Sequence, residues 1–413
     1  MDGKKRNLEN KILQLLESFP CVVILGVRQC GKSTLVKNKF PDWHYFDLEN
    51  INHFTRIDDD PILFFNEYPE KVIIDEAQQS PKLFSCLRGI IDADRNKKGR
   101  FILTGSASFN LIQNISESLA GRVGIIELST FKMNEFLEKP LPPFYKIFES
   151  KISNLTKEYL KQLKPDKDIK TIKRFLLKGG YPEPVLSKND TFFKDWMQNY
   201  FQTYITRDLR AIHPKLDFIK YRRVVLMLSS LSGTIINKTD ISRSIESSEK
   251  TVRDYVDIIN GTYFWRSLPA FASSKIKTTI KLPKGHFRDC GLAFYLQNIY
   301  TNKDLENFSR LGSFFENFIV EEIIKGIDAV NAYNVDLFHF RTKAGGEIDL
   351  LLQGSFGLLP IEIKYNSITP KKKLSSMINF IDKYDLPLGI VVNNSTEIQM
   401  ITDKIIQIPV GVI

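Results

Sequence analysis

Residues 26–34 read GVRQCGKST, and no other segment constrains the fold of this 413-residue chain as strongly. The spacing G-x-x-x-x-G-K-[ST] is that of a phosphate-binding loop, in which backbone N–H groups and the start of a helix point at an anion. The apolar run CVVIL before the loop predicts a short buried strand, and LVKNK after it predicts a helix. The sequence therefore predicts a strand, a phosphate-binding loop and a helix, in this order.

The residue types in this loop match the chemistry of a nucleotide triphosphate. Lys32 would reach the β- and γ-phosphates of ATP, and the hydroxyl of Ser33 would coordinate Mg²⁺. Gly26 and Gly31 allow the tight turn and the close approach of backbone to phosphate. The predicted nucleotide-binding residues are Gly26, Val27, Arg28, Gln29, Cys30, Gly31, Lys32, Ser33 and Thr34.

Short apolar runs alternate with helix-length segments as far as residue 130. The runs are CVVIL, WHYFDL, KVIIDEA, RFILTG and GIIEL. Strands separated by helices are typical of βαβ units, which build a mostly parallel sheet covered on both faces. Residues 1–130 are therefore predicted to form an α/β nucleotide-binding domain.

Polar residues that follow these strands are the candidate catalytic groups. Asp75 and Glu76 end the run VIIDE, where Asp75 would hold Mg²⁺ and Glu76 would polarise the attacking water. Thr104 or Ser106, at the end of the next strand, would sense the γ-phosphate or position the water. Arg122, in the loop SLAGR, either stabilises the charge of phosphoryl transfer, in its own chain or in a neighbouring subunit, or is a surface ion-pair partner.

The remaining chain divides into three predicted regions. Residues 131–217 are mostly helical and polar, residues 218–285 have the pattern of a winged helix-turn-helix, and residues 286–413 form a second, smaller α/β unit. In residues 218–285, two short helices across a tight turn precede a predicted β-hairpin. If this module contacts DNA, the helix contacts are Arg243, Lys250 and Arg253, and the wing contacts are Lys275, Lys277 and Lys281. The alternative is a winged helix used only for packing or oligomerisation.

The net charge of +10 is unevenly distributed. Residues 131–334 hold 33 Lys and Arg against 23 Asp and Glu, whereas the flanking segments are balanced. A basic middle region can meet nucleic acid through its phosphates, and it is equally typical of a solvated, lysine-rich surface.

The last eighty residues contain a second group of acids. Asp349 and the Glu362–Lys364 triplet lie on two strands joined by a short turn, and alternation places Glu362 and Lys364 on one face. Two carboxylates and a lysine suit a metal-dependent phosphodiesterase. The spacing resembles that of the PD-(D/E)XK nucleases, in which Glu316 would match the additional acid on an upstream helix. A degenerate, purely structural module is the alternative.

The segments GVRQCGKST, VIIDEAQ, LTGSAS and SLAGR, in this order, resemble the AAA+ superfamily. With GGYPEPV, YITRDL and the pair GEIDLLL and PIEIK, almost the whole chain resembles an uncharacterised prokaryotic family. In that family an AAA-type ATPase module precedes a C-terminal domain of unknown function with a winged helix and a nuclease-like end. The resemblance implies ATP and Mg²⁺ as ligands, a sensor role near Thr104, and assembly into a dimer or ring.

The other sequence features exclude several classes. No apolar run approaches the roughly 18 residues of a membrane span, and the charged N-terminus does not suit a signal peptide, so we expect a cytoplasmic protein without a membrane partner. The four cysteines show no metal-ligand spacing. The sequence thus favours an ATP-hydrolysing protein that couples nucleotide state to a DNA-associated C-terminal region. The alternatives are an ATP-regulated DNA nuclease and a non-catalytic switch that binds a protein partner.

Overall fold

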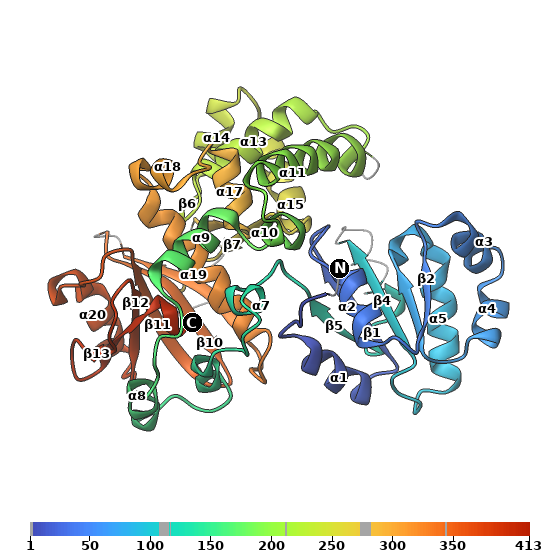
Figure 1. The fold of residues 1–413 in the computed structure, drawn as a ribbon, viewed down its shortest axis with the longest axis horizontal. Coiled ribbons are helices and arrows are strands. Elements are labelled where there is room, and N and C mark those ends of the chain that lie inside the picture. Colours follow the sequence, from blue (N-terminus) through green and yellow to red (C-terminus); the bar gives the residue numbers. More distant parts are fainter. Residues whose placement is uncertain (1–2, 107–114, 116, 211–212, 273–281, 343–344) are drawn as a thin grey trace. The chain divides into compact units, whose positions relative to one another are not determined.

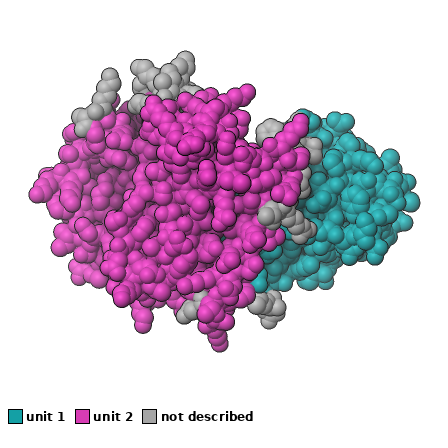
Figure 2. Space-filling model, turned by 90° about the horizontal axis from the view of Figure 1, so that it is seen from above, with its two compact units in different colours: residues 1–131, 181–183, 261–263 teal, residues 132–180, 184–260, 264–413 magenta. Residues whose placement is uncertain are grey.

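The computed structural model describes residues 3–413 except 107–114, 116, 211–212, 273–281 and 343–344. The contacts divide the chain into two compact units (Figure 2). Unit 1 contains residues 1–131 with the short segments 181–183 and 261–263. Unit 2 contains residues 132–180, 184–260 and 264–413.

Unit 1 is built on a sheet of five parallel strands in the order β2-β3-β4-β1-β5. Strand β1, between β4 and β5, is buried along its whole length, which explains its unbroken apolar sequence. The strands are β1 (Cys21–Gly26), β2 (His44–Asp47), β3 (Val72–Asp75), β4 (Phe101–Ser106) and β5 (Val123–Glu127). The predicted parallel α/β fold is confirmed.

Helices pack against this sheet (Figure 1). Apolar side chains of α3, α4 and α5 cover the face that carries Cys21, Val23 and Leu25, whereas α1 and α2 contact β1. The helices of this unit are α1 (Glu9–Ser18), α2 (Lys32–Lys39), α3 (Ile51–Asp59), α4 (Pro61–Glu67), the 3-10 helix η1 (Ala77–Gln79) and α5 (Pro81–Ala93).

The segment after unit 1 is helical, as the sequence predicted. Asp168 caps α9 by accepting a hydrogen bond from the Thr171 N–H, which explains where this helix begins. The helices are α7 (Met133–Phe136), η2 (Pro143–Phe148), α8 (Asn154–Lys161), α9 (Ile169–Lys178), α10 (Pro182–Leu186), α11 (Asp190–Thr203) and the π-helix η3 (Tyr204–Leu209).

The described residues of 218–287 form three helices and a small antiparallel sheet in the order β6-β8-β7. The sequence of elements is α13 (Phe218–Ser230), β6 (Thr234–Ile235), α14 (Lys238–Ser244), α15 (Glu249–Gly261), β7 (Trp265–Leu268) and β8 (Lys284–Phe287). The predicted wing lysines Lys275, Lys277 and Lys281 lie outside the described residues. Strand β8 spans the position at which the sequence placed a domain boundary, and that division of the chain stays a prediction.

The C-terminal part of unit 2 is a mixed sheet of six strands in the order β13-β14-β12-β11-β10-β9. Strands β9, β10 and β11 form an antiparallel meander, and β12 then pairs in parallel with β11. Helix α20 packs on the sheet through Met377 and Phe380. The elements are α17 (Cys290–Leu296), α18 (Asn302–Asn307), α19 (Leu311–Ile327), β9 (Asp336–Arg341), β10 (Glu347–Gly354), β11 (Gly357–Lys364), η4 (Lys371–Leu374), α20 (Ser375–Lys383), β12 (Gly389–Asn393), β13 (Gln399–Met400), β14 (Ile405–Pro409) and η5 (Val410–Val412).

Candidate functional site

The phosphate-binding loop connects the end of β1 to the start of α2. Gly31 has a φ of 96° and Gln29 a φ of 64°, so both residues lie in the left-handed region that favours glycine. A Cβ atom at Gly26 would lie 2.1 Å from the carbonyl oxygen of Leu128. The shape of the loop therefore depends on glycine at positions 26 and 31.

Lys32 is buried at the first position of α2. Its Nζ atom donates hydrogen bonds to the carbonyl oxygens of Gly26, at 3.2 Å, and Val27, at 3.1 Å. Both acceptors are neutral, so these contacts leave the positive charge of the ammonium uncancelled. The loop thus holds a cationic group beside the N-terminus of a helix, an arrangement that favours an anion.

Arg6 supports the loop from the N-terminal segment, a role that no sequence pattern indicated. Its guanidinium donates to the carbonyl oxygen of Cys30, at 2.9 Å, and to that of Ser129, at 2.6 Å. The same group lies 4.9 Å from the ring centroid of Phe131. Arg6 therefore connects the phosphate-binding loop to the chain that follows β5.

Asp75 ends strand β3 and is buried. Its carboxylate accepts hydrogen bonds from the hydroxyls of Tyr45 and Thr104, each on a neighbouring strand of the sheet. The side chain of Ser33 also lies beside the Tyr45 hydroxyl, so the two predicted Mg²⁺ ligands share one neighbour. Burial, with the Asp75 carboxylate, raises the pKa of Tyr45 well above its usual value, which keeps the phenol a donor.

Glu76 follows with a φ of 53°, in the left-handed region that non-glycine residues seldom adopt. Its carboxylate accepts hydrogen bonds from the Ser106 hydroxyl and the Ser106 N–H, both at 3.3 Å, and from the Gln78 amide. Like Asp75, Glu76 has uncharged donors as its partners. A carboxylate held in this way keeps its negative charge for a water or a cation.

Arg122 forms a bidentate ion pair with Asp92 on α5, with N···O distances of 2.7 Å and 2.8 Å. The pair is exposed, and the pKa of Arg122 is raised mainly by its hydrogen bond to Asp92. Of the two roles considered for Arg122, the ion pair is the one present within this chain.

The predicted acids of the C-terminal sheet also come together. Lys364 Nζ lies 2.6 Å from the Glu362 carboxylate and 3.5 Å from that of Asp349. The Ile363 N–H donates to Asp349 at 2.8 Å. Asp349 lies in an irregularity of the β9–β10 ladder between Ile348 and Leu351, where a bulge redirects side chains.

Lys284, which the sequence did not single out, lies among these acids. Its Nζ atom is 2.6 Å from Glu316, 2.7 Å from Glu347 and 3.1 Å from Asp349. Glu347 precedes Asp349 by two positions, a spacing that alternation along a strand would have revealed. Lys284 has no such signal, because its strand lies far from the acids in sequence. We call Glu316, Glu347, Asp349 and Glu362 the carboxylate cluster.

The pKa values of the cluster follow from burial and from the two lysines. Burial and the charge of Asp349 raise the pKa of Glu316 well above its usual value and that of Glu362 to about 8. Burial also opposes the ionisation of Asp349, but Lys284 and Lys364 outweigh it and lower that pKa to about 2. Of Glu316, Asp349 and Glu362, Asp349 is thus the acid that ionises most readily, because it lies between two ammonium groups.

Comparison with known protein families finds a match for most of unit 1. The model of the AAA domain family matches residues 18–137, a range that includes the phosphate-binding loop, Asp75 and Glu76. We call residues 18–137 the AAA domain, after the family model that they match. Two further models, each for a domain of unknown function (DUF8612 and DUF4143), match residues 169–303 and 311–413.

Two proteins are similar to this chain over almost its whole length. The uncharacterized proteins Rv2008c of Mycobacterium tuberculosis and Mb2031c of Mycobacterium bovis are each 28% identical over 408 residues, which cover 98% of this chain and 83% of theirs. Among solved structures, the Walker-type ATPase PABY2304 of Pyrococcus abyssi aligns with 71% of this chain and 98% of its own, at 14% identity and a TM-score of 0.40. The RuvB Holliday junction branch migration motor of Thermotoga maritima aligns with 64% of this chain and 89% of its own, at 15% identity and a TM-score of 0.30.

The predicted DNA contacts on helices α14 and α15 are exposed and have acidic neighbours. Arg253 lies 3.1 Å from Glu249 on the same helix, and Arg243 lies 3.7 Å from Asp240. Lys250 is exposed on α15, which also exposes the acids Asp254 and Asp257. Helix α15 thus exposes Glu249, Lys250, Arg253, Asp254 and Asp257, three acids against two basic residues.

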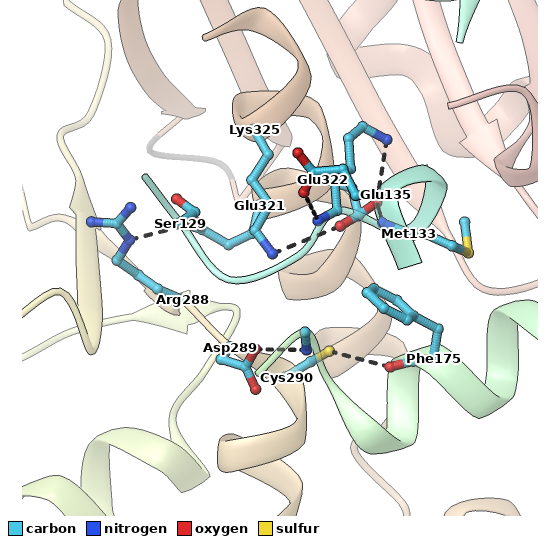
Figure 3. A network of polar contacts seen from close by, with 12 residues as sticks. Ser129, Met133, Glu135, Phe175, Arg288, Asp289, Cys290, Glu321, Glu322 and Lys325 are labelled. Atoms are coloured by element: carbon cyan, nitrogen blue, oxygen red, sulfur yellow. Dashed lines mark hydrogen bonds and ion pairs between the residues drawn. The ribbon is translucent and has the colours of Figure 1, made fainter. Parts of the chain in front are cut away.

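Helix α19 carries a second buried ion network, around Glu321 and Glu322 (Figure 3). Glu322 accepts hydrogen bonds from the Met133 N–H, at 3.0 Å, and from Lys132 Nζ, at 3.2 Å. Burial lowers the pKa of Lys132 to about 8, against the opposing charge of Glu322. Lys132 is the first residue of unit 2, so this network fixes the chain directly after residue 131, where the first segment of unit 1 ends.

Within the described part of the chain, no helix is long and apolar enough to cross a membrane. The same residues contain no group of three or more His, Cys, Asp and Glu side chains arranged to hold a metal ion. This result does not bear on the predicted Mg²⁺ site of the AAA domain, where Ser33 and Asp75 would be protein ligands and phosphate oxygens and water would complete the shell.

Proposed function

We propose that this protein binds Mg²⁺–ATP at its AAA domain and hydrolyses it. One observation carries the proposal: Lys32, Asp75 and Thr104 lie at the same edge of the parallel sheet, at or near the ends of adjacent strands. Ligands of open α/β sheets bind at this edge. The uncharged partners of Lys32, Asp75 and Glu76 support a site that keeps its charges for a nucleotide and a cation.

The proposed roles follow from position. The N–H groups of residues 26–34 and the ammonium of Lys32 hold the phosphates, and Ser33 and Asp75 hold Mg²⁺. When bound, Mg²⁺ neutralises charge on the β- and γ-phosphate oxygens. Glu76 orients and polarises the attacking water, and Ser106 keeps its carboxylate in place. Thr104 fixes the Asp75 carboxylate, which makes Thr104 a positioning residue.

Steady-state ATP hydrolysis by the full chain tests this proposal. We expect Lys32→Ala to lose both nucleotide binding and turnover, and Glu76→Gln to bind ATP but lose turnover. Lys98→Ala, which removes an exposed lysine of the same unit, is the matched control and should behave as wild type. Equal turnover in all four proteins would refute the proposal.

We also propose that Arg122 acts on the nucleotide of a neighbouring subunit, a role that needs the predicted dimer or ring. The exposure of the Arg122–Asp92 pair supports this role, because an exposed ion pair contributes little and exchanges partners at small cost. Mixing Arg122→Ala with Glu76→Gln chains tests it. Recovery of ATP hydrolysis above that of either variant supports action between subunits, and no recovery contradicts it.

For residues 218–287 we propose a winged helix used for packing. The element order α13-β6-α14-α15-β7-β8 supports the winged-helix assignment. Strand β8 is buried along its length, and Ala270, just after β7, pairs with His339 of the C-terminal sheet. A DNA-contacting wing would instead need exposed basic strands.

The exposed charge of α15 points in the same direction, because three acids would face DNA phosphates. Fluorescence anisotropy with labelled duplex DNA at low salt tests the packing role. We expect that neither Lys250→Glu nor Arg253→Glu lowers the affinity of the protein for duplex DNA. An affinity that both substitutions lower would restore the DNA-contact prediction.

The nuclease alternative has one supporting observation, the convergence of Asp349 on β10 with Glu362 and Lys364 on β11. The position of Lys284 weighs against it, because a divalent metal ion does not fit where an ammonium already contacts three carboxylates. Incubation with plasmid and single-stranded DNA and with Mg²⁺ or Mn²⁺ tests the alternative. Cleavage that Asp349→Ala abolishes would establish it.

A further inference from the structure

We propose that the carboxylate cluster is a latent site for a divalent cation, and that the ammonium of Lys284 fills the cation position in the folded chain. The resemblance to nucleases does not predict the position of the Lys284 ammonium, because Lys284 lies outside the acidic motif, on a strand of the small three-stranded sheet. The inference concerns unit 2 alone and does not depend on the proposed ATPase activity.

The contacts of Lys284 are those of a coordinated cation. A lysine ammonium has three N–H donors, and three carboxylates lie within 2.6 to 3.1 Å of Nζ. One of these acids comes from α19 and two come from β10, so the ammonium holds a helix and a strand together. Oxygen atoms of several carboxylates around one centre are also the ligands that Mg²⁺ and Mn²⁺ prefer.

Lys284 is fixed in this position by its backbone. Strand β8 is the middle strand of its sheet, with β6 on one side and β7 on the other. The residue is 2% exposed. The charges of the acids raise its pKa well above the usual value, against the effect of burial, so the ammonium keeps its proton. The cluster therefore carries its own cation, which cannot diffuse away.

A metal ion and Lys284 exclude each other. A divalent cation at this point would stand beside a buried ammonium with which it shares its ligands, and the repulsion in a poorly hydrated interior is large. His286, two residues along β8, is fully buried, and neither of its ring nitrogens has a hydrogen-bond partner. Burial and Lys284 lower its pKa well below the usual value, so His286 stays neutral and adds no second charge.

Two carboxylate oxygens of the cluster have no hydrogen-bond partner: Glu362 Oε2, and Glu316 Oε1, which contacts Lys284 only as an ion pair. Glu362 is 5% exposed. If the ammonium is removed and its space is left open, Glu362 and the three acids that Lys284 releases can provide oxygen ligands for a divalent ion. An apolar side chain in the same space would block the divalent ion, although it also lacks the positive charge of the ammonium.

Binding of Mn²⁺ to the full chain without nucleotide, measured from the electron paramagnetic resonance signal of free Mn²⁺, tests the proposal. We expect Lys284→Ala to gain Mn²⁺ binding at least about 100-fold tighter than any in wild type, because a neighbouring positive charge is removed. Lys284→Met, which removes the charge but fills the space, should gain much less. Addition of Asp349→Asn to Lys284→Ala should abolish the gain.

Two outcomes would overturn the proposal. The first is Mn²⁺ binding by the wild type that Glu362→Gln or Asp349→Asn removes, because the metal would then coexist with Lys284. The second is a Lys284→Ala protein that is folded, by circular dichroism and thermal unfolding, but gains no Mn²⁺. If Lys284→Ala does not fold, wild type and Glu362→Gln decide: equal Mn²⁺ binding supports the proposal, and weaker binding in the variant refutes it.

Discussion

The AAA domain and the C-terminal sheet both bring lysine and carboxylate side chains together, but they pair them differently. In the AAA domain, Lys32 hydrogen-bonds to backbone carbonyl oxygens, and Asp75 accepts from two hydroxyls. In the C-terminal sheet, Lys284 contacts three carboxylates directly, and Lys364 contacts two. The first site keeps its charges available, whereas the second cancels most of them internally.

This difference teaches how an acidic site is kept ready for a cation. Uncharged donors orient a carboxylate without neutralising it, so a metal ion or a substrate can still gain from its charge. A direct ion pair in a buried site must first be broken, and breaking it leaves an uncompensated buried charge. Convergence of acids alone is therefore weak support for a metal site. The hydrogen-bond and ion-pair partners of those acids decide whether their charge is available to a metal ion.

The largest expected effect separates the two sites. Asp75→Asn should lower ATP hydrolysis by about 100-fold or more, because the proposed Mg²⁺ ligand loses its charge. Asp349→Asn, the same change at the other site, should leave ATP hydrolysis within about twofold of wild type. Steady-state phosphate release measures both. Similar losses in the two variants would mean that the sites are functionally coupled, and the comparison would fail.

A second substitution tests whether uncharged partners matter. Thr104→Val keeps the size of a buried side chain but removes the hydroxyl that donates to Asp75. We expect a loss of about tenfold in ATP hydrolysis, the usual cost when a residue that orients a metal ligand is removed. The loss should decrease at high Mg²⁺ concentration if Thr104 acts through Asp75. A magnesium-independent loss would point to direct contact with the nucleotide.

Arg6 allows a smaller test on the same side of the comparison. Arg6→Ala removes two hydrogen bonds that hold the phosphate-binding loop to the chain after β5. We expect ATP affinity to fall by several-fold, up to about tenfold, the equivalent of about one charged hydrogen bond. Arg88→Ala, on the exposed side of α5, is the matched control. Fluorescence titration with a labelled ATP analogue measures both, and equal affinities would exclude this role for Arg6.

The last test concerns the stability of the C-terminal sheet and its dependence on pH, and not ATP hydrolysis. The pKa of Glu362 is raised from its usual 4.5 to about 8, so between these values the folded chain retains a proton that the unfolded chain has lost. The free energy of unfolding should therefore fall as the pH rises from 5 to 8, by at most about 1.4 kcal/mol for each pH unit.

Glu362→Gln cannot titrate and should flatten this dependence. Urea unfolding of wild type and variant at pH 5 and pH 8 measures the difference. An unchanged slope in the variant would show that Glu362 ionises normally, and the description of the cluster as internally neutralised would need revision.

Much of the AAA domain could be predicted from local sequence. Gly26, Gly31 and Lys32 are specified by a contiguous motif, and the apolar runs before and after it locate the strands of the parallel sheet. The position of Asp75 followed from the rule that parallel strands end at one edge. Asp349, Glu362 and Lys364 could also be grouped, since a short turn joins their strands.

The residues that sequence reasoning missed are those that act over long separations. Arg6 meets the phosphate-binding loop from the N-terminal segment, and Tyr45 reaches Asp75 from a neighbouring strand. Lys284 contacts Glu347 and Asp349 although it lies more than sixty residues before them and belongs to a different sheet. None of these contacts leaves a periodic or local pattern, because each is set by how distant elements pack.

By itself, the sequence determined the phosphate-binding loop, the parallel α/β fold around it and the grouping of acids near the C-terminus. These are short-range properties of spacing, alternation and backbone freedom. Only the tertiary structure decided which partner each charged group has. That choice decides the chemistry, because an acid beside a hydroxyl keeps its charge for a ligand, whereas an acid beside a buried lysine has already used it.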